Sequence, residues 1–366
     1  MSIIIFIIIL GLLVLSHEFG HFIVAKWNGI RVDEFGFGFP PRLFSVTKGE
    51  TTYSINLIPF GGFVKIFGED GPPGEEVVDM SRSFPAQHRF IQGLVVAAGI
   101  ICNILLAWVL FTVGFMMGMP TPSDVAFYGP VSNVHTVITE VLVDSPAAKA
   151  GLLPGEEIVA LKSGDATLAT PSTQQIREFM ASHGGKPVTI TYQKPGASAP
   201  ETVTVTPVAA SELEKPVVGI ALDSLGVVKL NPFQALIAGA RLTKDTLVDT
   251  ATGLAYFLSQ LVGGQARTAL EGVTGPVGLV GVVGTATMFG FVYLLGLTAT
   301  ISLNLAVINL IPFPALDGGR LLFIIIEAIK RSPLNPKITN AWNSIGFVLL
   351  MLLMLAVTWH DIAKLI

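Results

Sequence analysis

The stretch Ser-His-Glu-Phe-Gly-His at residues 16–21 lies inside an almost wholly apolar run that begins at Ile3. It matches the pattern H-E-x-x-H. A helix places residues four apart on one face, so His17 and His21 can bind one metal ion while Glu18 faces a water molecule at that metal. The same pattern also occurs by chance, as two histidines of a surface helix. Here that alternative would place two imidazoles and a carboxylate in hydrocarbon without a purpose, so the stretch predicts a metal site inside a membrane helix.

The composition is that of an integral membrane protein with a polar insert. Of the 366 residues, 51% are hydrophobic and 13% are charged, whereas soluble proteins carry about 25% charged residues. The net charge of -4 gives no sign of nucleic-acid binding. The single cysteine, Cys102, lies in an apolar run, which excludes a disulfide framework and a cysteine-ligated zinc site.

Four membrane-length segments are expected, and basic residues indicate their direction. No Lys or Arg precedes the first, while Lys26 and Arg31 follow it. The positive-inside rule therefore places the N-terminus outside and the metal motif in the cytoplasmic half of its helix. Without a basic n-region or a small-residue cleavage site, this segment is expected to be an uncleaved span. Asn103, in the second segment, is expected to form a helix–helix hydrogen bond. The four segments are residues 3–25, 91–117, 288–310 and 345–359.

Residues 31–68 read as β structure rather than as a helix. Two strand-like runs flank a turn at residues 48–50, which predicts a hairpin, and the apolar residues 56–66 read as a further strand. One interpretation is a cytoplasmic hairpin without a role. The other is a sheet that dips beside the metal site, where an unpaired edge would accept an extended peptide. The charged, Pro- and Gly-rich residues 68–89 read as a flexible cytoplasmic loop.

Residues 121–225 are expected to form a soluble domain outside the membrane. Residues 145–161, SPAAKAGLLPGEEIVAL, resemble the helix of a PDZ domain followed by its L-x-x-G-D-x-I strand, with Glu156 in the place of Asp. Ser145 is the expected N-cap of that helix and Pro146 lies in its first turn. A PDZ fold usually implies capture of an extended chain along an exposed edge. A spacer or a steric filter is the alternative, since a fold alone does not imply a function.

A surface helix and a broken membrane helix are expected after this domain. The first starts at Asn231-Pro232 and is too polar to span, so we expect it to lie on the outer membrane surface. The third membrane segment ends in residues 304–320, where two prolines and two glycines break the helix around Asp317. Asp317 can complete a two-histidine-plus-carboxylate zinc site that leaves a position open for water. Its alternative role is to cap a helix at residues 319–329.

The motif of the first segment, the PDZ insert and the N-x-x-P-x-x-x-L-D-G run at residues 309–318 together resemble the site-2 protease family of intramembrane zinc metalloproteases. The resemblance covers essentially the whole chain and is strongest to the type of the bacterial regulator of sigma-E protease. Two features differ from many bacterial members: one PDZ domain instead of two, and Gly99-Ile100 where those members have Gly-Pro. The resemblance implies a Zn²⁺ ion, a membrane-dipping β element at residues 31–68 and a gating helix after the PDZ domain. It also implies roles for single residues: zinc ligands His17, His21 and Asp317, general base Glu18, and substrate-seating residues Asn309 and Pro312.

We therefore expect a polytopic α-helical membrane protein with four transmembrane helices, a membrane-associated β-hairpin element and one inserted extracytoplasmic PDZ domain. The expected parts are the first transmembrane helix (1–30), the β region and loop (31–90), the second transmembrane helix (91–119), the PDZ domain (120–226), the amphipathic gating region (227–285), the third transmembrane helix with its Leu-Asp-Gly site (286–320), and the last loop with the fourth transmembrane helix (321–366).

The expected function is hydrolysis of peptide bonds within or near transmembrane segments of single-pass membrane proteins, such as an anti-sigma factor or a remnant signal peptide. The expected location is the bacterial inner membrane, with both termini and the PDZ domain outside and the active site towards the cytoplasm. The PDZ domain would bind a peptide or a substrate ectodomain. A catalytically silent scaffold is the alternative, and it would make Glu18 dispensable. A transporter with a broken helix ranks behind both, because no paired internal repeat is seen.

Overall fold

The computed structural model describes residues 2–69, 80–123, 128–197, 199–209, 216–265 and 274–363. The chain divides into two compact units, which are described separately. The first unit comprises residues 1–110, 242–283 and 298–366, and the second comprises residues 111–241 and 284–297. Residues 70–79 of the loop predicted at residues 68–89 lie outside the described residues.

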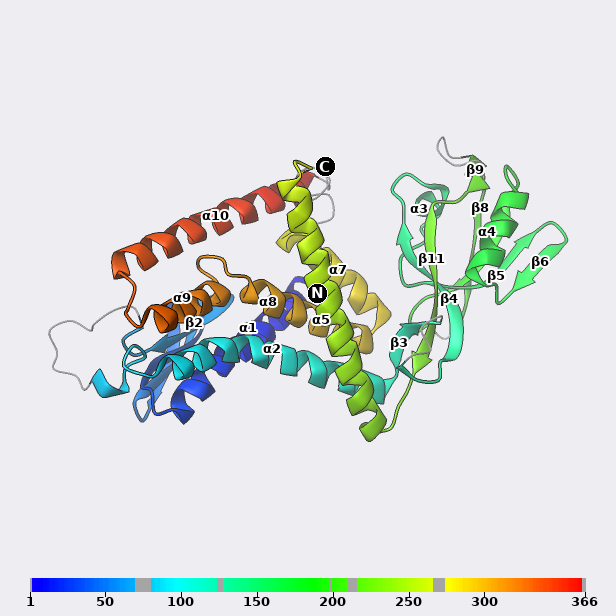
Figure 1. Ribbon diagram of the computed structural model, residues 1–366. Helices are drawn as coiled ribbons and strands as arrows, with labels where there is room; N and C mark the ends of the chain where they lie inside the picture. Colours follow the sequence, from blue (N-terminus) through cyan, green and yellow to red (C-terminus); the bar gives the residue numbers. More distant parts are fainter. Residues whose placement is uncertain are drawn as a thin grey trace. The chain divides into compact units, whose positions relative to one another are not determined.

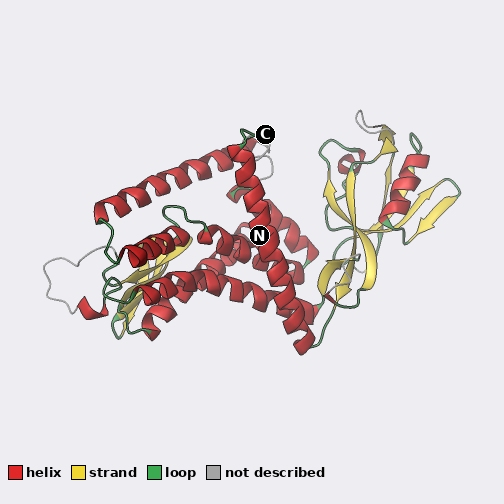
Figure 2. Cartoon of the chain, viewed as in Figure 1, coloured by secondary structure: helices red, strands yellow, loops and turns green. Residues whose placement is uncertain are grey.

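Helices dominate the first unit, apart from one small sheet (Figures 1 and 2). Four helices of the described chain are long and apolar enough to cross a membrane: α1, α2, α8 and most of α10. They coincide with the four predicted segments. The helices of the chain outside the strand-rich region are α1 (Ser2–Trp27), α2 (Arg89–Met117), α5 (Pro232–Val262), α7 (Pro276–Phe289), α8 (Phe291–Leu310), α9 (Asp317–Lys330) and α10 (Pro336–Ala363), and a 3₁₀ turn, η1, spans Met80–Arg82.

Two boundaries differ from the predicted ones for local reasons. The third segment was expected to begin at Met288, but α7 ends at Phe289 and α8 starts at Phe291, because Gly290 between them has a φ of +103° that a helix cannot accommodate. The fourth helix starts nine residues before the predicted Ile345, since its first turns are polar and carry no hydropathy signal. The surface helix starts as predicted, with Asn231 Oδ1 accepting a hydrogen bond from Gln234 N at 3.0 Å.

The predicted β region forms two long strands, β1 (Val32–Lys48) and β2 (Thr51–Ile66). Residues 34–37 of β1 pair with residues 52–55 of β2 on one side and with residues 62–65 on the other. The hairpin therefore folds over itself into four short segments, in the order 44–48, 51–56, 34–37 and 62–65. Among the described strands, none other pairs with residues 62–65, so this segment is an open edge of the sheet.

The sheet packs directly on α1. A Cβ on Gly11 would lie 3.1 Å from the Phe37 ring, so the glycine lets the strand approach the helix closely. Directly after the metal motif, the Phe22 ring lies 5.2 Å from Phe35 and 6.0 Å from Tyr53. These aromatic contacts pack one face of the sheet against the helix.

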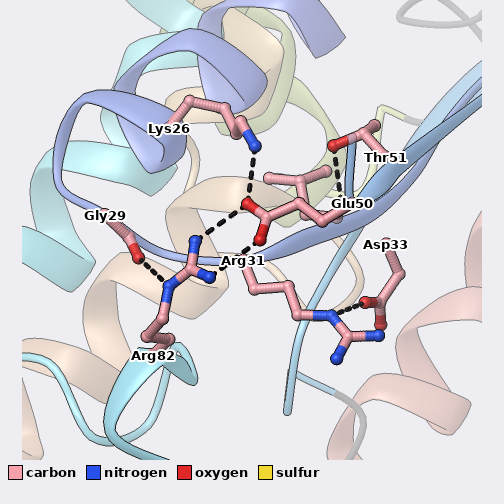
Figure 3. A network of polar contacts seen from close by, with 8 residues as sticks. Lys26, Gly29, Arg31, Asp33, Glu50, Thr51 and Arg82 are labelled. Atoms are coloured by element: carbon pink, nitrogen blue, oxygen red, sulfur yellow. Dashed lines mark hydrogen bonds and ion pairs between the residues drawn. The ribbon is translucent and has the colours of Figure 1, made fainter. Parts of the chain in front are cut away.

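Charged residues tie the tip of the hairpin to the end of α1 (Figure 3). Glu50 accepts hydrogen bonds from Lys26 Nζ at 2.7 Å and from both terminal nitrogens of Arg82 at 2.8 Å. Arg82 Nε also donates to the carbonyl of Gly29 at 3.0 Å. The hydrogen bonds from Arg82 and Lys26 lower the pKa of Glu50 to about 2, so the carboxylate stays charged at neutral pH.

The second unit contains a mostly antiparallel sheet in the order β3-β11-β4-β5-β7-β8, with β6 paired to β5. Buried apolar side chains such as Ile158, Leu161 and Ile190 fill its core together with Ile176 of α4. The helix and the strand predicted within residues 145–161 are confirmed as α3 and β5. The elements are β3 (Met119–Pro122), β4 (Ser132–Val141), α3 (Pro146–Lys149), β5 (Glu157–Ser163), β6 (Ala166–Ala169), α4 (Thr173–Ser182), β7 (Val188–Gln193), β8 (Glu201–Val205), β9 (Val208–Ala209), β10 (Pro216–Val217) and β11 (Ile220–Val228).

The residues that carry the PDZ resemblance have local structural roles. Ser145 Oγ accepts a hydrogen bond from Ala148 N at 3.1 Å, which confirms the predicted N-cap. Glu156 closes the turn before β5, because its Oε2 accepts from Leu153 N at 3.0 Å. Burial raises the pKa of Glu156 above its ordinary value. Glu156 thus accepts a backbone hydrogen bond at the position where the PDZ pattern has Asp.

Candidate metal centre

Three side chains predicted as ligands converge on one point. Asp317 Oδ2 lies 3.0 Å from His17 Nε2 and 3.4 Å from His21 Nε2, and the two histidine nitrogens are 3.2 Å apart. The side chains are 12–16% exposed. Helix α1 supplies both histidines from consecutive turns, while α9 supplies the aspartate almost 300 residues later.

The geometry suits a zinc ion. Tetrahedral bonds of about 2.0–2.2 Å place ligand atoms roughly 3.3–3.6 Å apart, close to the three separations observed. Asp317 Oδ2 is buried and has no hydrogen bond of acceptable geometry, so a cation would satisfy an otherwise unpaired oxygen. Within the described residues, His17, His21 and Asp317 form the one cluster of His, Cys, Asp or Glu side chains that can hold a metal ion. Three protein ligands leave a fourth position open.

The broken end of α8 carries Asp317 back to the histidines. Pro312 and Pro314 follow the last turn of α8, and proline cannot continue a helical hydrogen-bond ladder. A Cβ on Gly318 would collide with the carbonyl oxygens of Leu310 and Ile311, so this position needs glycine. The helix-capping alternative for Asp317 is wrong, because the N-cap of α9 is the preceding residue and no side chain caps that helix.

One stripe of α2, residues 95, 99 and 103, lies behind the histidines. His21 Nδ1 donates a hydrogen bond to the Val95 carbonyl at 2.9 Å. A Cβ on Gly99 would lie 2.6 Å from His21 Cε1 and 2.8 Å from His17 Cε1, so only glycine leaves room for both rings. Asn103 Nδ2 lies 3.4 Å from His17 Nδ1. Sequence reasoning gave Asn103 only a helix–helix role, although its position one turn after Gly99 was a signal that both face one site.

Two neighbouring cavities adjoin the centre. The inner cavity, of about 140 Å³, is lined by the three ligands, Glu18 and residues of β2 and α2. The outer cavity, of about 760 Å³, is lined by β2, by the loop before Asp317 and by Asn340 and Asn343 of α10. The ion pair of Arg320 and Glu69 lines both cavities. The inner cavity is too small for a folded helix, so a peptide must reach it as a narrow extended segment.

The open edge of the sheet lies beside Glu18. A Cβ on Gly62 would be 3.3 Å from Glu18 Cγ and 2.9 Å from Val14. Val64 lines both cavities. Of the two interpretations of residues 31–68, the structure therefore favours the sheet beside the metal site.

Asn309 and Pro312 stand apart from this arrangement. Asn309 lies in the last turn of α8, and Pro312 lies in the break that follows. Among the described residues that line the inner and outer cavities, neither of the two occurs. Their role in seating the substrate stays a prediction.

Comparison with known proteins identifies the family. The sequence model of peptidase family M50 matches residues 5–353. The chain belongs to peptidase family M50, the site-2 protease family. The chain is 31% identical to the zinc metalloprotease RasP of Geobacillus kaustophilus, with 99% of this chain and 98% of that protein covered. It is 29% identical to the regulator of sigma-W protease RasP of Bacillus subtilis, with 100% and 99% covered.

These matches confirm the predicted family and enzyme class: the chain is a membrane zinc metalloprotease of the site-2 type. The chain also matches a solved PDZ domain of the SdrC-like protein from Listeria monocytogenes with 26% sequence identity. This match covers 25% of this chain and 92% of that domain, and its TM-score is 0.21.

Replacing Gly99 with alanine is expected to abolish stoichiometric metal binding, because the new methyl group would push both imidazoles off the common point. Metal content of the purified protein, measured by mass spectrometry, checks this. Gly93→Ala is the matched control on the same helix, since the nearest atom to its new Cβ is 4.0 Å away. Full metal content in Gly99→Ala would contradict the proposed ligand geometry.

Proposed function

We propose that this protein cleaves single-pass membrane proteins within or near their transmembrane segments, using His17, His21 and Asp317 as zinc ligands and Glu18 as the general base. The observation that carries the proposal is the convergence of three ligand atoms next to Glu18, with Glu18 and both histidines on one membrane-length helix. The RasP of Bacillus subtilis is named a regulator of sigma-W protease. We extend that role to this chain, with an anti-sigma factor as the expected kind of substrate and a bacterial cell membrane as its location.

Glu18 performs the proton transfers in this proposal. Zinc, when bound, would lower the pKa of a water molecule and polarise the scissile carbonyl. Glu18 lines the same cavity as the three ligands, where its carboxylate takes a proton from the attacking water and passes it to the leaving amide nitrogen. Val64, Ile66 and Val95 wall this cavity with apolar side chains and limit its water content.

The substrate is proposed to bind as an added strand on residues 62–65. A carbonyl inside an intact helix is hydrogen-bonded and covered, so a transmembrane substrate must unwind before it reaches Glu18. The open edge offers unpaired backbone groups next to the inner cavity. Asn309 and Pro312, at the break of α8, would help to hold the other side of that strand.

The PDZ-like part of the second unit, residues 120–226, is proposed to lie outside the membrane and to control which substrates arrive. Residues 220–223 of β11 pair with β4 on one side. On the other side, among the described strands, only β3 pairs with β11, at residues 225–228. The stretch 220–223, which no described strand covers on that side, supports peptide capture. A size filter that excludes bulky ectodomains is the alternative.

Glu18→Gln is expected to lower cleavage by about 10²–10⁴-fold, the usual contribution of a general base, while zinc content is retained. His17→Ala is expected to lose both, because it removes a ligand. The measurement is cleavage of a reconstituted single-span substrate together with zinc content of the same preparation. Glu140→Gln, an exposed site in the second unit, is the control. Wild-type cleavage by Glu18→Gln would support the silent-scaffold alternative instead.

In an antiparallel strand only alternate residues direct their N–H to a given edge, so one of residues 63 and 64 donates to the open edge. Proline at that position is expected to slow cleavage about five- to tenfold, because it removes one hydrogen bond to the substrate, which contributes about 1–1.5 kcal/mol. Val46→Pro, on the opposite edge of the sheet, is the control. Zinc content is measured in each variant to show that the centre is intact. If both Phe63→Pro and Val64→Pro cleave at the wild-type rate, substrate does not bind by strand addition here.

Removal of the PDZ-like domain distinguishes capture from exclusion. Deletion of residues 124–223 with a short Gly-Ser linker keeps β3 paired with the end of β11, and Ser123 N already donates to the Ser224 carbonyl at 2.8 Å. Cleavage of a substrate that retains its full ectodomain is measured. A size filter predicts that cleavage rises on deletion, whereas a capture site predicts that it falls. An unchanged rate would mean that the domain does neither.

A further inference from the structure

Asn103 of α2 is fully buried beside the metal centre, with 0% of its surface exposed. Its amide nitrogen Nδ2 lies 3.4 Å from His17 Nδ1, across 86 residues of sequence. Its carbonyl oxygen Oδ1 is buried and has no hydrogen-bond partner. A buried, unpaired oxygen is costly, so it has to be asked which of the two amide atoms, Oδ1 or Nδ2, faces the histidine ring.

The tautomer of His17 decides which amide atom faces the ring. His17 Nε2 faces Asp317 and His21, and it must keep a lone pair to bind a metal ion. The neutral ring then carries its proton on Nδ1, which becomes a donor that needs an acceptor. The oxygen and nitrogen of an asparagine amide occupy nearly equivalent positions and are assigned from hydrogen bonding. Exchanging them places Oδ1 opposite the Nδ1–H, so the unpaired oxygen gains a donor.

The other histidine ligand already shows this arrangement. His21 Nδ1 donates to the backbone carbonyl of Val95, one α2 stripe position away from Gly99 and two from Asn103. The stripe therefore offers one acceptor to each ring: a main-chain oxygen to His21 and a side-chain oxygen to His17. Gly99 between them leaves space for both rings.

The position of Asn103 is fixed from a third helix. Ser302 Oγ of α8, also 0% exposed, donates to the main-chain carbonyl of Asn103 at 2.8 Å. Helix α8 leads directly into the break that carries Asp317. One asparagine thus contacts α1 through its side chain and α8 through its backbone.

We infer that Asn103 is a positioning residue for the metal centre: its Oδ1 accepts the Nδ1–H of His17 and so fixes the tautomer and orientation in which Nε2 faces the metal. The inference rests on the proposed zinc site and adds a residue outside its ligand set. Hydrogen bonds of this kind orient histidine ligands and raise their basicity.

Two substitutions separate this role from packing. Asn103→Leu keeps the branched shape of the side chain but removes the acceptor, and it is expected to weaken zinc binding by about 10–100-fold, the usual loss when such a hydrogen bond is removed. Asn103→Asp keeps the acceptor and is expected to retain affinity close to wild type. Ser16→Ala is the matched control, because it removes a neighbouring α1–α2 hydrogen bond, from Ser16 Oγ to the Cys102 carbonyl at 3.5 Å, without touching the rings.

Zinc affinity is measured on the full-length protein by competition with a chelator, independently of cleavage. ¹⁵N NMR of histidine-labelled protein, with His17→Gln used to assign the signal, reads the tautomer of His17. The expected wild-type result is a protonated, hydrogen-bonded Nδ1 and a zinc-bound Nε2. Wild-type zinc affinity in Asn103→Leu would overturn the inference, and so would coordination through Nδ1.

The outcomes also separate the inference from the proposed function. If Asn103→Leu does not fold, the NMR spectrum of the wild type and the zinc affinity of Asn103→Asp test the inference. A loss of zinc affinity of about 10–100-fold in Asn103→Asp would then overturn the role of Asn103 as an acceptor for His17. If the wild type binds zinc and Glu18→Gln stops cleavage while Asn103→Leu binds normally, only the inference fails. If the wild type binds no zinc, both fail.

Discussion

Two imidazoles and a carboxylate meet within 3.4 Å of one another inside an otherwise apolar assembly of helices, and the rest of the first unit is arranged around them. Such groups are costly at membrane depth unless each one is paired. Here each histidine directs one nitrogen to the shared point, and α2 lies behind the other. A cation at that point would satisfy the buried oxygen of Asp317. Without a metal ion the cluster therefore lowers the stability of the fold, and metal binding would offset that loss.

Glycine residues let the helices of the metal centre approach one another closely. Gly20 lets α1 lie against the backbone of Ala98, and Gly99 lets α2 lie against both histidine rings. Gly318 lets the start of α9 fold back on the end of α8. In each case a methyl group would collide with backbone or with a ligand, and neither can move aside cheaply. Close packing of helices through small residues is the usual solution in membranes, where hydrophobic burial does not drive helices together.

The sheet adds chemistry that helices cannot offer. Helical backbone groups bond within the helix, whereas the segment 62–65 presents an open edge next to Glu18. The ion pairs around Glu50 fix the far end of the hairpin to α1, so the edge is held relative to the metal site by both ends of the sheet (Figure 3). A rigid edge beside a rigid centre is what peptide hydrolysis needs, because the scissile carbonyl must be placed within a fraction of an ångström.

The sequence by itself determined the four apolar helices, the two-histidine motif, the helix break around Asp317 and the helix and strand of residues 145–161. Each of these depends on local patterns: hydropathy over about 20 residues, a four-residue spacing, or proline and glycine chemistry. Tertiary structure alone decided that β1 folds over to pair with β2 twice, that residues 62–65 flank Glu18, and that Asn103 faces His17. Those contacts join residues far apart in the chain, and they follow from how helices approach one another, which no local pattern encodes. The histidines could be read from residues 17 and 21, but their support by α2 could be seen only in the fold.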